Sequence, residues 1–164
     1  MQRVAILTVS DRCSNGKQED LSGPAIADCL RASEHALAWY GIVPDEQEEI
    51  MDKLKYLCEF VDVDIILTTG GTGLSPRDVT PEATLQLADR VVPGIAEAMR
   101  AQTAAQAPRS MLSRGVVVAH GHKLIINLPG SPKAVRECMC VILPVLDHAA
   151  NVLKGAVRGC AATP

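Results

Sequence analysis

Three glycines occur within four residues in the segment Thr69-Gly70-Gly71-Thr72-Gly73, immediately after an apolar run. Because glycine has no side chain, such a segment can approach a ligand closely and point several backbone N–H groups at one anion. It is neither a Walker loop, since no Gly-Lys-Ser/Thr follows, nor the G-x-G-x-x-G dinucleotide fingerprint. The segment predicts a local anion-binding loop, with a plain strand-to-loop turn as the alternative.

Three aspartates, Asp11, Asp45 and Asp78, are candidates for chemistry beside this loop. Asp78 lies two residues before the expected N-cap Thr80, so capping does not explain it. A carboxylate beside an anion site commonly holds Mg²⁺ or orients a nucleophile. Asp45 has a competing interpretation, because Asp45-Glu46-Gln47-Glu48 is also a good capping box. Asp11 could equally be an acidic residue of a loop that takes no part in chemistry.

The remaining candidates for binding chemistry have less specific patterns. Arg77, Arg114 and Lys133 could each neutralise the charge of a substrate or be a solvated surface cation. The six cysteines are scattered without a C-x-x-C pair, so they read as free thiols rather than zinc ligands. His120 and His122 fall in a predicted hairpin turn, and we interpret them as turn residues rather than metal ligands.

Composition limits the class of protein. A chain of 164 residues with 48% apolar and 21% charged residues is typical of one globular domain. A net charge of −3 gives no overall basic field, which argues against nucleic-acid binding. No apolar run approaches the ~20 residues that span a bilayer, and the N-terminus shows no signal-peptide pattern. We therefore expect a cytoplasmic protein with no membrane partner.

Short apolar runs alternate with segments of helical periodicity, which predicts a parallel sheet covered by helices. The predicted strands are residues 4–9, 36–43, 64–69, 116–119 and 124–128. The predicted helices begin near Gly23, Glu46, Thr80, Gly94 and Ser131. Residues 11–22 read as a long loop, and the last two strands as an antiparallel hairpin at the edge of the sheet. The prediction is a three-layer α/β/α fold with a mostly parallel sheet, formed by one domain over residues 1–155 with a tail at 156–164.

Four polar segments follow the predicted strands and should meet at one edge of this sheet. They are Ser10-Asp11, Pro44-Asp45, the glycine run and Pro129-Gly130-Ser131. In open α/β sheets, ligands bind outside the carboxyl ends of the strands. This edge is therefore the expected binding site.

Five ordered blocks of the sequence together resemble the molybdenum-cofactor biosynthesis family. This family includes the bacterial Mog and MoaB proteins and the G domains of gephyrin and its plant counterpart. The blocks are Thr8-Val9-Ser10-Asp11-Arg12, Asp20-Leu21-Ser22-Gly23-Pro24, Thr68-Thr69-Gly70-Gly71-Thr72-Gly73, Pro76-Arg77-Asp78-Val79-Thr80-Pro81-Glu82 and Leu128-Pro129-Gly130-Ser131-Pro132. The resemblance extends to about Gly155 and implies a molybdopterin-binding, MogA-like fold.

The resemblance implies a molybdopterin adenylyltransferase, a nucleotidyltransferase that transfers AMP from Mg-ATP to molybdopterin and releases pyrophosphate. Asp45 and Asp78 match the family's essential acids and are the implied Mg²⁺ ligands, so Asp45 would act as both cap and catalyst. Asp11 is the third catalytic candidate, from its place on the shared edge. The candidates for binding substrate or nucleotide are Ser10, Thr69, Gly70, Gly71, Thr72, Gly73, Arg77, Pro129, Gly130 and Ser131.

The resemblance also implies a homotrimer and a downstream molybdenum-insertion protein as partner. The link from Pro132 through Cys138 lacks the insertion seen in some bacterial Mog proteins and is closer to MoaB and eukaryotic G-domain patterns. The alternative function is therefore a MoaB-type protein that binds molybdopterin as a carrier, sensor or scaffold without robust catalysis.

Overall fold

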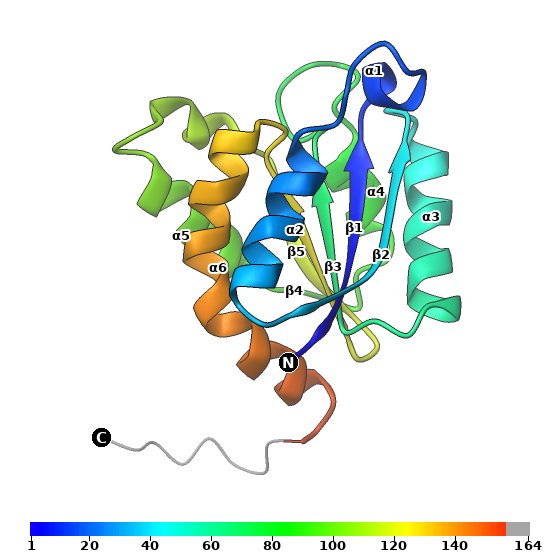
Figure 1. Cartoon of the computed structure of the whole chain (residues 1–164), viewed down its shortest axis with the longest axis vertical. Helices are drawn as coiled ribbons and strands as arrows, with labels where there is room; N and C mark the ends of the chain where they lie inside the picture. The colour runs from blue at the N-terminus through cyan, green and yellow to red at the C-terminus, as the bar shows by residue number, and fades with distance from the viewer. Residues whose placement is uncertain (157–164) are drawn as a thin grey trace.

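A single six-stranded sheet runs through the computed structural model, which describes residues 1–156 (Figure 1). The strands are β1 (Arg3–Val9), β2 (Ala36–Val43), β3 (Ile65–Thr69), β4 (Arg90–Val91), β5 (Val117–His120) and β6 (Lys123–Leu128), in the order β2-β1-β3-β6-β5-β4. β2, β1, β3 and β6 are parallel, whereas β5 is antiparallel to both β6 and β4. The predicted mostly parallel sheet with an antiparallel hairpin is confirmed.

Helices cover both faces of the sheet, as Figure 1 shows. They are α1 (Asp11–Ser14), α2 (Ser22–Ala32), α3 (Gln47–Phe60), α4 (Thr80–Leu85), α5 (Pro93–Thr103) and α6 (Pro132–Leu153), with a 3-10 helix η1 (Pro108–Leu112). α2, α5 and α6 share one hydrophobic core with the sheet, and α3 and α4 share the other. The result is the predicted three-layer architecture.

The alternation of side chains along β1 explains why its sequence is apolar throughout. Val4 and Ile6 lie in the core beneath α2, α5 and α6, while Ala5, Leu7 and Val9 lie in the core beneath α3 and α4. Successive residues of a strand point to opposite faces, and both faces of this strand are buried. A continuous apolar run is the sequence signature of that environment.

Two short elements depart from the sequence prediction. The helix α1 lies inside the predicted loop 11–22, where the Ser10 side chain accepts a hydrogen bond from Cys13 N at 3.2 Å and caps it. β4 has only two exposed residues and pairs with β5 as the outermost strand. Neither element is long enough to leave a periodic pattern in the sequence.

The predicted tail 156–164 lies outside the described residues except for Ala156. Within residues 1–156, no helix combines the length and the apolar character that crossing a bilayer requires.

Candidate functional site

Two adjoining cavities open at the carboxyl edge of the parallel strands. We call the larger one, of about 550 Å³, the large pocket, and the smaller one, of about 260 Å³, the acidic cleft. Gly71, Asp78 and Gly130 line both of them. The cleft is lined by the ends of β1 and β3, where the strand order reverses direction, which is where ligands bind in open α/β sheets.

The glycine run can follow this path beside the two cavities only because its first two glycines, Gly70 and Gly71, have no side chain. Gly70 and Gly71 have positive φ angles of 96° and 64°. A Cβ atom at Gly70 would collide with the carbonyl oxygen of Val9, and one at Gly71 would collide with the hydroxyl of Thr80. Glycine is therefore required at both positions for conformation and for space.

Thr80 ties the glycine run to α4 instead of capping that helix. Its hydroxyl donates to the carbonyl oxygen of Gly70 at 2.9 Å, and its N–H donates to that of Gly71 at 3.1 Å. The N-cap of α4 is Val79, which has no side-chain cap. The sequence prediction of Thr80 as N-cap was wrong, because the hydroxyl finds a partner in the tertiary structure.

Asp45 and Asp11 form a reciprocal pair across the ends of β1 and β2. Asp45 Oδ2 accepts from Asp11 N at 2.7 Å, and Asp11 Oδ1 accepts from Asp45 N at 3.0 Å. The N-cap of α3 is Glu46, which makes no side-chain cap hydrogen bond. The capping interpretation of Asp45 is therefore wrong, since its carboxylate is engaged by Asp11.

The two members of this pair differ in their affinity for a proton. Burial raises the pKa of Asp45, and the negative charges of Asp11 and Asp78 raise it further. The pKa of Asp11 is lowered, mainly by the backbone hydrogen bond from Asp45 and also by Arg77. Asp45 therefore sits where a cation would be favourable, because a positive charge would relieve the repulsion among the carboxylates.

Arg77 has an exposed side chain and lines neither cavity. Its guanidinium makes two hydrogen bonds of 2.9 and 3.1 Å to Asp11 Oδ2, and it pairs with Glu46 at 2.8 Å. Asp11 is also absent from both linings. Of the predicted site residues, these two lie outside the cavity linings, where Arg77 holds Asp11 and Asp11 in turn holds Asp45.

Asp78 is held at the junction of the cavities by its own loop and by Arg114. Asp78 Oδ2 accepts from Ser75 N at 2.9 Å. Arg114 donates to the carbonyl oxygens of Gly73 at 2.7 Å and Asp78 at 2.6 Å, and it forms an ion pair with Glu82. Arg114 is thus neither a cation that neutralises substrate charge nor a solvated surface cation, the two alternatives that the sequence suggested. It clamps the loop that carries Asp78.

The other predicted binding residues divide between the cavities. Ser10, Thr69 and Gly70 line the cleft, and the Thr69 hydroxyl donates to the carbonyl oxygen of Pro129 at 2.7 Å. The members that line the large pocket are Thr72, Gly73, Pro129 and Ser131. Ser131 accepts from Ala134 N at 3.2 Å and caps α6, as predicted.

Asp20 is a residue of the cleft that the sequence analysis did not single out. Its carboxylate accepts from Thr8 at 2.6 Å, from Tyr40 at 2.7 Å, and from the N–H groups of Ser22 and Gly23. Burial alone would raise the pKa of Asp20, but these four hydrogen bonds outweigh it and lower the pKa. The signal for this role was the position of an aspartate two residues before the start of α2.

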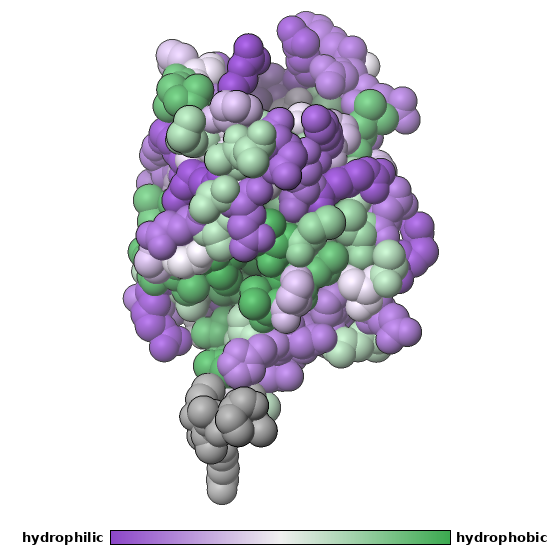
Figure 2. All heavy atoms as spheres, turned by 90° about the vertical axis from the view of Figure 1, so that its left-hand side faces the viewer, coloured by the Kyte–Doolittle hydropathy of each residue, from purple (hydrophilic) through white to green (hydrophobic). Residues whose placement is uncertain are grey.

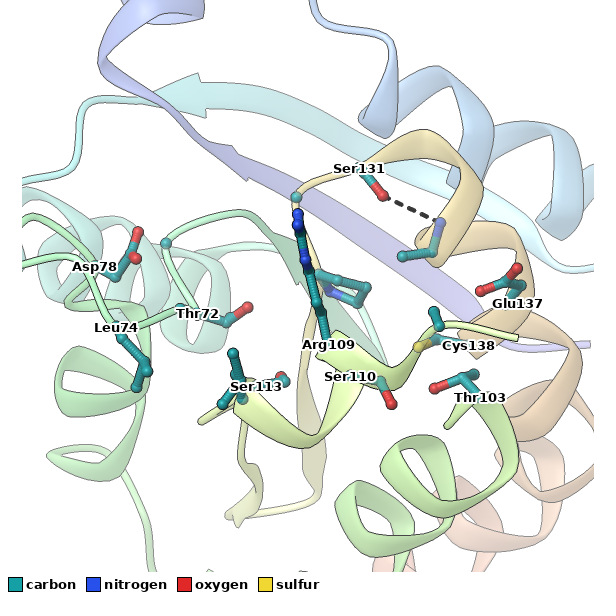
Figure 3. Close-up of a pocket in the computed structure, with 17 residues that line it drawn as sticks. Thr72, Leu74, Asp78, Thr103, Arg109, Ser110, Ser113, Ser131, Glu137 and Cys138 are labelled. Carbon is teal, nitrogen blue, oxygen red and sulfur yellow. Dashed lines mark hydrogen bonds between the residues drawn. The ribbon is translucent and has the colours of Figure 1, made fainter. Parts of the chain in front are cut away.

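Two charged residues of the large pocket also escaped the sequence analysis. Arg109 extends from η1 across the pocket towards the loop that carries Ser131, and Glu137 lies on the opposite side from Asp78 (Figure 3). Neither follows a strand or belongs to a glycine-rich segment. No local pattern could have marked them.

The charge of the cleft is one-sided. Four carboxylates line it, and none of the described residues in its lining is lysine or arginine. No group of three or more His, Cys, Asp or Glu side chains among residues 1–156 is arranged to hold a metal ion. An anion can therefore enter this cleft favourably only together with a cation.

The fold and site define a doubly wound α/β domain with two adjoining cavities at its topological switch point. Residues 5–148 match the family model described as "Probable molybdopterin binding domain". The chain belongs to this molybdopterin-binding family.

Proteins with related sequences and structures support this membership. The molybdopterin adenylyltransferase of Helicobacter pylori is 40% identical over 93% of this chain and 88% of its own length. The cinnamon protein of Drosophila melanogaster is 40% identical over 90% of this chain, which covers 25% of that protein. The crystal structure of MoaB from Thermus thermophilus superposes with a TM-score of 0.89 at 48% identity, over 94% of this chain and 98% of that one. A MogA structure superposes with a TM-score of 0.87 at 40% identity, over 92% of this chain and 99% of that one.

Proposed function

We propose that this protein is a molybdopterin adenylyltransferase that transfers AMP from Mg-ATP to molybdopterin. The observation that carries the proposal is the pair of cavities that share a wall at Gly71, Asp78 and Gly130. Two phosphate-bearing substrates must meet at one point for such a transfer. Adjoining cavities with one common carboxylate supply that geometry.

In the reaction, an oxygen of the terminal phosphate of molybdopterin forms a bond to the α-phosphorus of ATP. The bond from that phosphorus to the bridging oxygen of the β-phosphate breaks, and pyrophosphate leaves. Gly71 and Gly130 line both cavities and let the meeting phosphates come close to the backbone, where N–H groups would stabilise the developing negative charge. Asp78, at the junction, orients the two reactants.

Mg²⁺ enters this proposal with ATP. The cleft suits that form of the nucleotide because four carboxylates and no described basic side chain line it. Mg²⁺ usually binds through one or two carboxylates together with substrate phosphates and water, not in an all-protein cage. Asp45 and Asp78 are the residues that would hold it.

The proposal is tested by the release of pyrophosphate from molybdopterin and Mg-ATP. We expect the wild-type protein to release it and Asp78→Ala to reduce the rate by about 100-fold or more, because the residue common to both substrates is lost. Asp52→Ala, on the exposed side of α3, is the matched control and should keep the wild-type rate. Normal turnover by a folded Asp78→Ala variant would remove Asp78 from catalysis.

The alternative is a MoaB-type protein that binds molybdopterin without adenylylating it. The greater identity to the MoaB structure, 48% against 40% for MogA, favours this alternative. The same assay separates the two functions. Wild-type protein that binds molybdopterin but releases no pyrophosphate would be a carrier or sensor.

Further parts of the proposal concern assembly and setting. We propose that the protein folds as one domain over residues 1–155 and assembles as a homotrimer. We also propose that it acts in the cytoplasm and delivers its product to a molybdenum-insertion protein. An apolar groove between α5 and α6, lined by Ile95, Ala98, Val141 and Val145, supports self-association, and Figure 2 shows apolar side chains gathered on this face. A monomer in sedimentation at working concentration would contradict the trimer.

A further inference from the structure

Glu137 is the one acid of the large pocket that lies away from the glycine run. It stands on α6 just after Ala134, which also lines the pocket, and immediately before the buried Cys138. Figure 3 shows Glu137 on one side of the pocket and Asp78 on the other, with Arg109 and Thr72 between them. A ligand whose phosphate lies at the glycine run would therefore direct its far end towards Glu137.

The carboxylate of Glu137 has an unused capacity to accept hydrogen bonds. Its Oε2 atom is buried and has no hydrogen-bond partner in the part of the chain that the structure describes. Its Oε1 atom has Lys133 Nζ at 3.9 Å, but the Lys133 side chain is 80% exposed. A buried acceptor without a donor costs free energy, so its presence calls for a ligand or another compensating role.

Two of the hydroxyl groups that line the pocket, those of Thr103 and Ser110, already donate to other acceptors. The Thr103 hydroxyl donates to the carbonyl oxygen of Met99 at 2.7 Å, and the Ser110 hydroxyl donates to that of Arg100 at 3.1 Å. A hydroxyl has one proton to donate, so both donors are already engaged. A ligand that fills the pocket can supply the donors that Glu137 lacks.

We propose that Glu137 recognises the aminopyrimidine edge of the pterin ring and so determines which substrate enters the large pocket. The proposal rests on the proposed function, which supplies a pterin as substrate. The pterin edge presents two adjacent N–H donors, the 2-amino group and N3–H, which match the two oxygens of a carboxylate as a guanidinium does. Adenine presents one donor beside a ring-nitrogen acceptor, which a carboxylate repels. Glu137 thus directs the pterin to the large pocket and leaves the acidic cleft to ATP.

The test compares two ring systems that differ at this edge. The probes are the phosphate monoesters of 6-hydroxymethylpterin and 6-hydroxymethyllumazine, whose 2-oxo group replaces the amino donor by an acceptor. We expect the wild-type protein to bind the pterin about 10- to 100-fold more tightly than the lumazine, because one charge-assisted pair is lost and a repulsion is introduced. Intrinsic ring fluorescence measures both Kd values.

Glu137→Gln should abolish this preference, since an amide offers one donor and one acceptor. The ratio of the two Kd values should fall to about 1, whereas the Kd for Mg-ATP should stay within about twofold. A merely structural role would weaken both rings equally and leave the ratio unchanged. Glu97→Gln, at an exposed position of α5, is the matched control and should keep the wild-type ratio.

The outcomes separate this proposal from the transferase proposal. A wild-type ratio near 1, or a folded Glu137→Gln variant that keeps the preference, overturns the role of Glu137 even if pyrophosphate is released normally. A strong preference for pterin without any release of pyrophosphate supports Glu137 and contradicts the transferase. The ratio of the two Kd values can be measured on the wild-type protein alone. A ratio near 1 would therefore overturn the proposal even if Glu137→Gln fails to fold.

Discussion

The acidic cleft and the large pocket share one wall but use different side chains on their other walls. The cleft is lined by carboxylates and hydroxyls, and its acids are Glu19, Asp20, Asp45 and Asp78. The large pocket has apolar walls that include Leu74, Ala107, Leu112 and Ala134. Its acids, Asp78 and Glu137, lie on opposite sides (Figure 3). Under the proposed function, the cleft would take the cation-bound polyphosphate and the pocket would take the flat ring with its polar edge.

The comparison also shows where rigidity is needed. In the cleft, Asp20 accepts four hydrogen bonds, and Asp11 and Asp45 hold each other through backbone N–H groups. In the large pocket, Glu137 is left without such partners among the described residues. Carboxylates that are already satisfied position the site, whereas an unsatisfied one is available to a ligand.

Among the variants that test the difference between the acidic cleft and the large pocket, Asp45→Asn is expected to have the largest effect. Asp45 lines the cleft and not the large pocket. The variant should lose about 100-fold in pyrophosphate release and keep its affinity for the pterin probe, because only the metal-binding charge is removed. Fluorescence titration and the release assay measure the two quantities, with Asp52→Asn as control. Loss of pterin binding in a folded variant would show that the two cavities are not separable.

The raised pKa of Asp45 adds a dependence on pH to the same variant. The folded chain holds this proton more tightly than the unfolded chain, so its contribution to stability is present below the unfolded pKa and is lost as pH rises through the folded pKa. At pH 7, Asp45→Asn should therefore unfold at the wild-type temperature or above it. Wild-type turnover should fall as pH decreases through the raised pKa, because protonation removes the metal ligand.

An intermediate effect is expected from Arg114→Met, because Arg114 positions the loop that both cavities share. Loss of its bonds to the carbonyl oxygens of Gly73 and Asp78 should lower kcat by about tenfold and the free energy of unfolding by about 1–3 kcal/mol. Arg114→Lys should restore only part of kcat, since an ammonium cannot reproduce the planar fork. The control is Arg136→Met at an exposed position of α6. An unchanged kcat would limit Arg114 to a structural role.

The smallest effect is expected from Tyr40→Phe, which removes one of the four donors to Asp20. We expect a loss of about 0.5–1.5 kcal/mol in the free energy of unfolding and turnover within about threefold of wild type. The lowered pKa of Asp20 contributes stability above its unfolded pKa, and this contribution is lost as pH falls through the folded pKa. Denaturant titrations should therefore show a larger difference at pH 7 than at pH 3. Tyr56→Phe, on the exposed side of α3, is the control, and an equal loss in both variants would contradict the role of Tyr40.

The sequence by itself determined the layers of this protein and the loops that meet at its sheet edge. Apolar runs marked β1, β3 and β6 because strands buried on both faces admit few polar residues. Glycine at positions 70 and 71 marked the loop that leads into the shared wall, since no other residue fits there. Such features depend on local conformation or on an average environment, which nearby residues encode.

Only the tertiary structure decided which partner each polar side chain takes. Asp45 and Thr80 have good local patterns for capping, yet Asp11 N engages the first and the carbonyl oxygen of Gly70 engages the second. Arg114 and Glu137 acquire their surroundings from segments far away in the chain. A hydrogen bond forms with whichever group the fold brings within about 3 Å, and that distance does not depend on separation along the sequence.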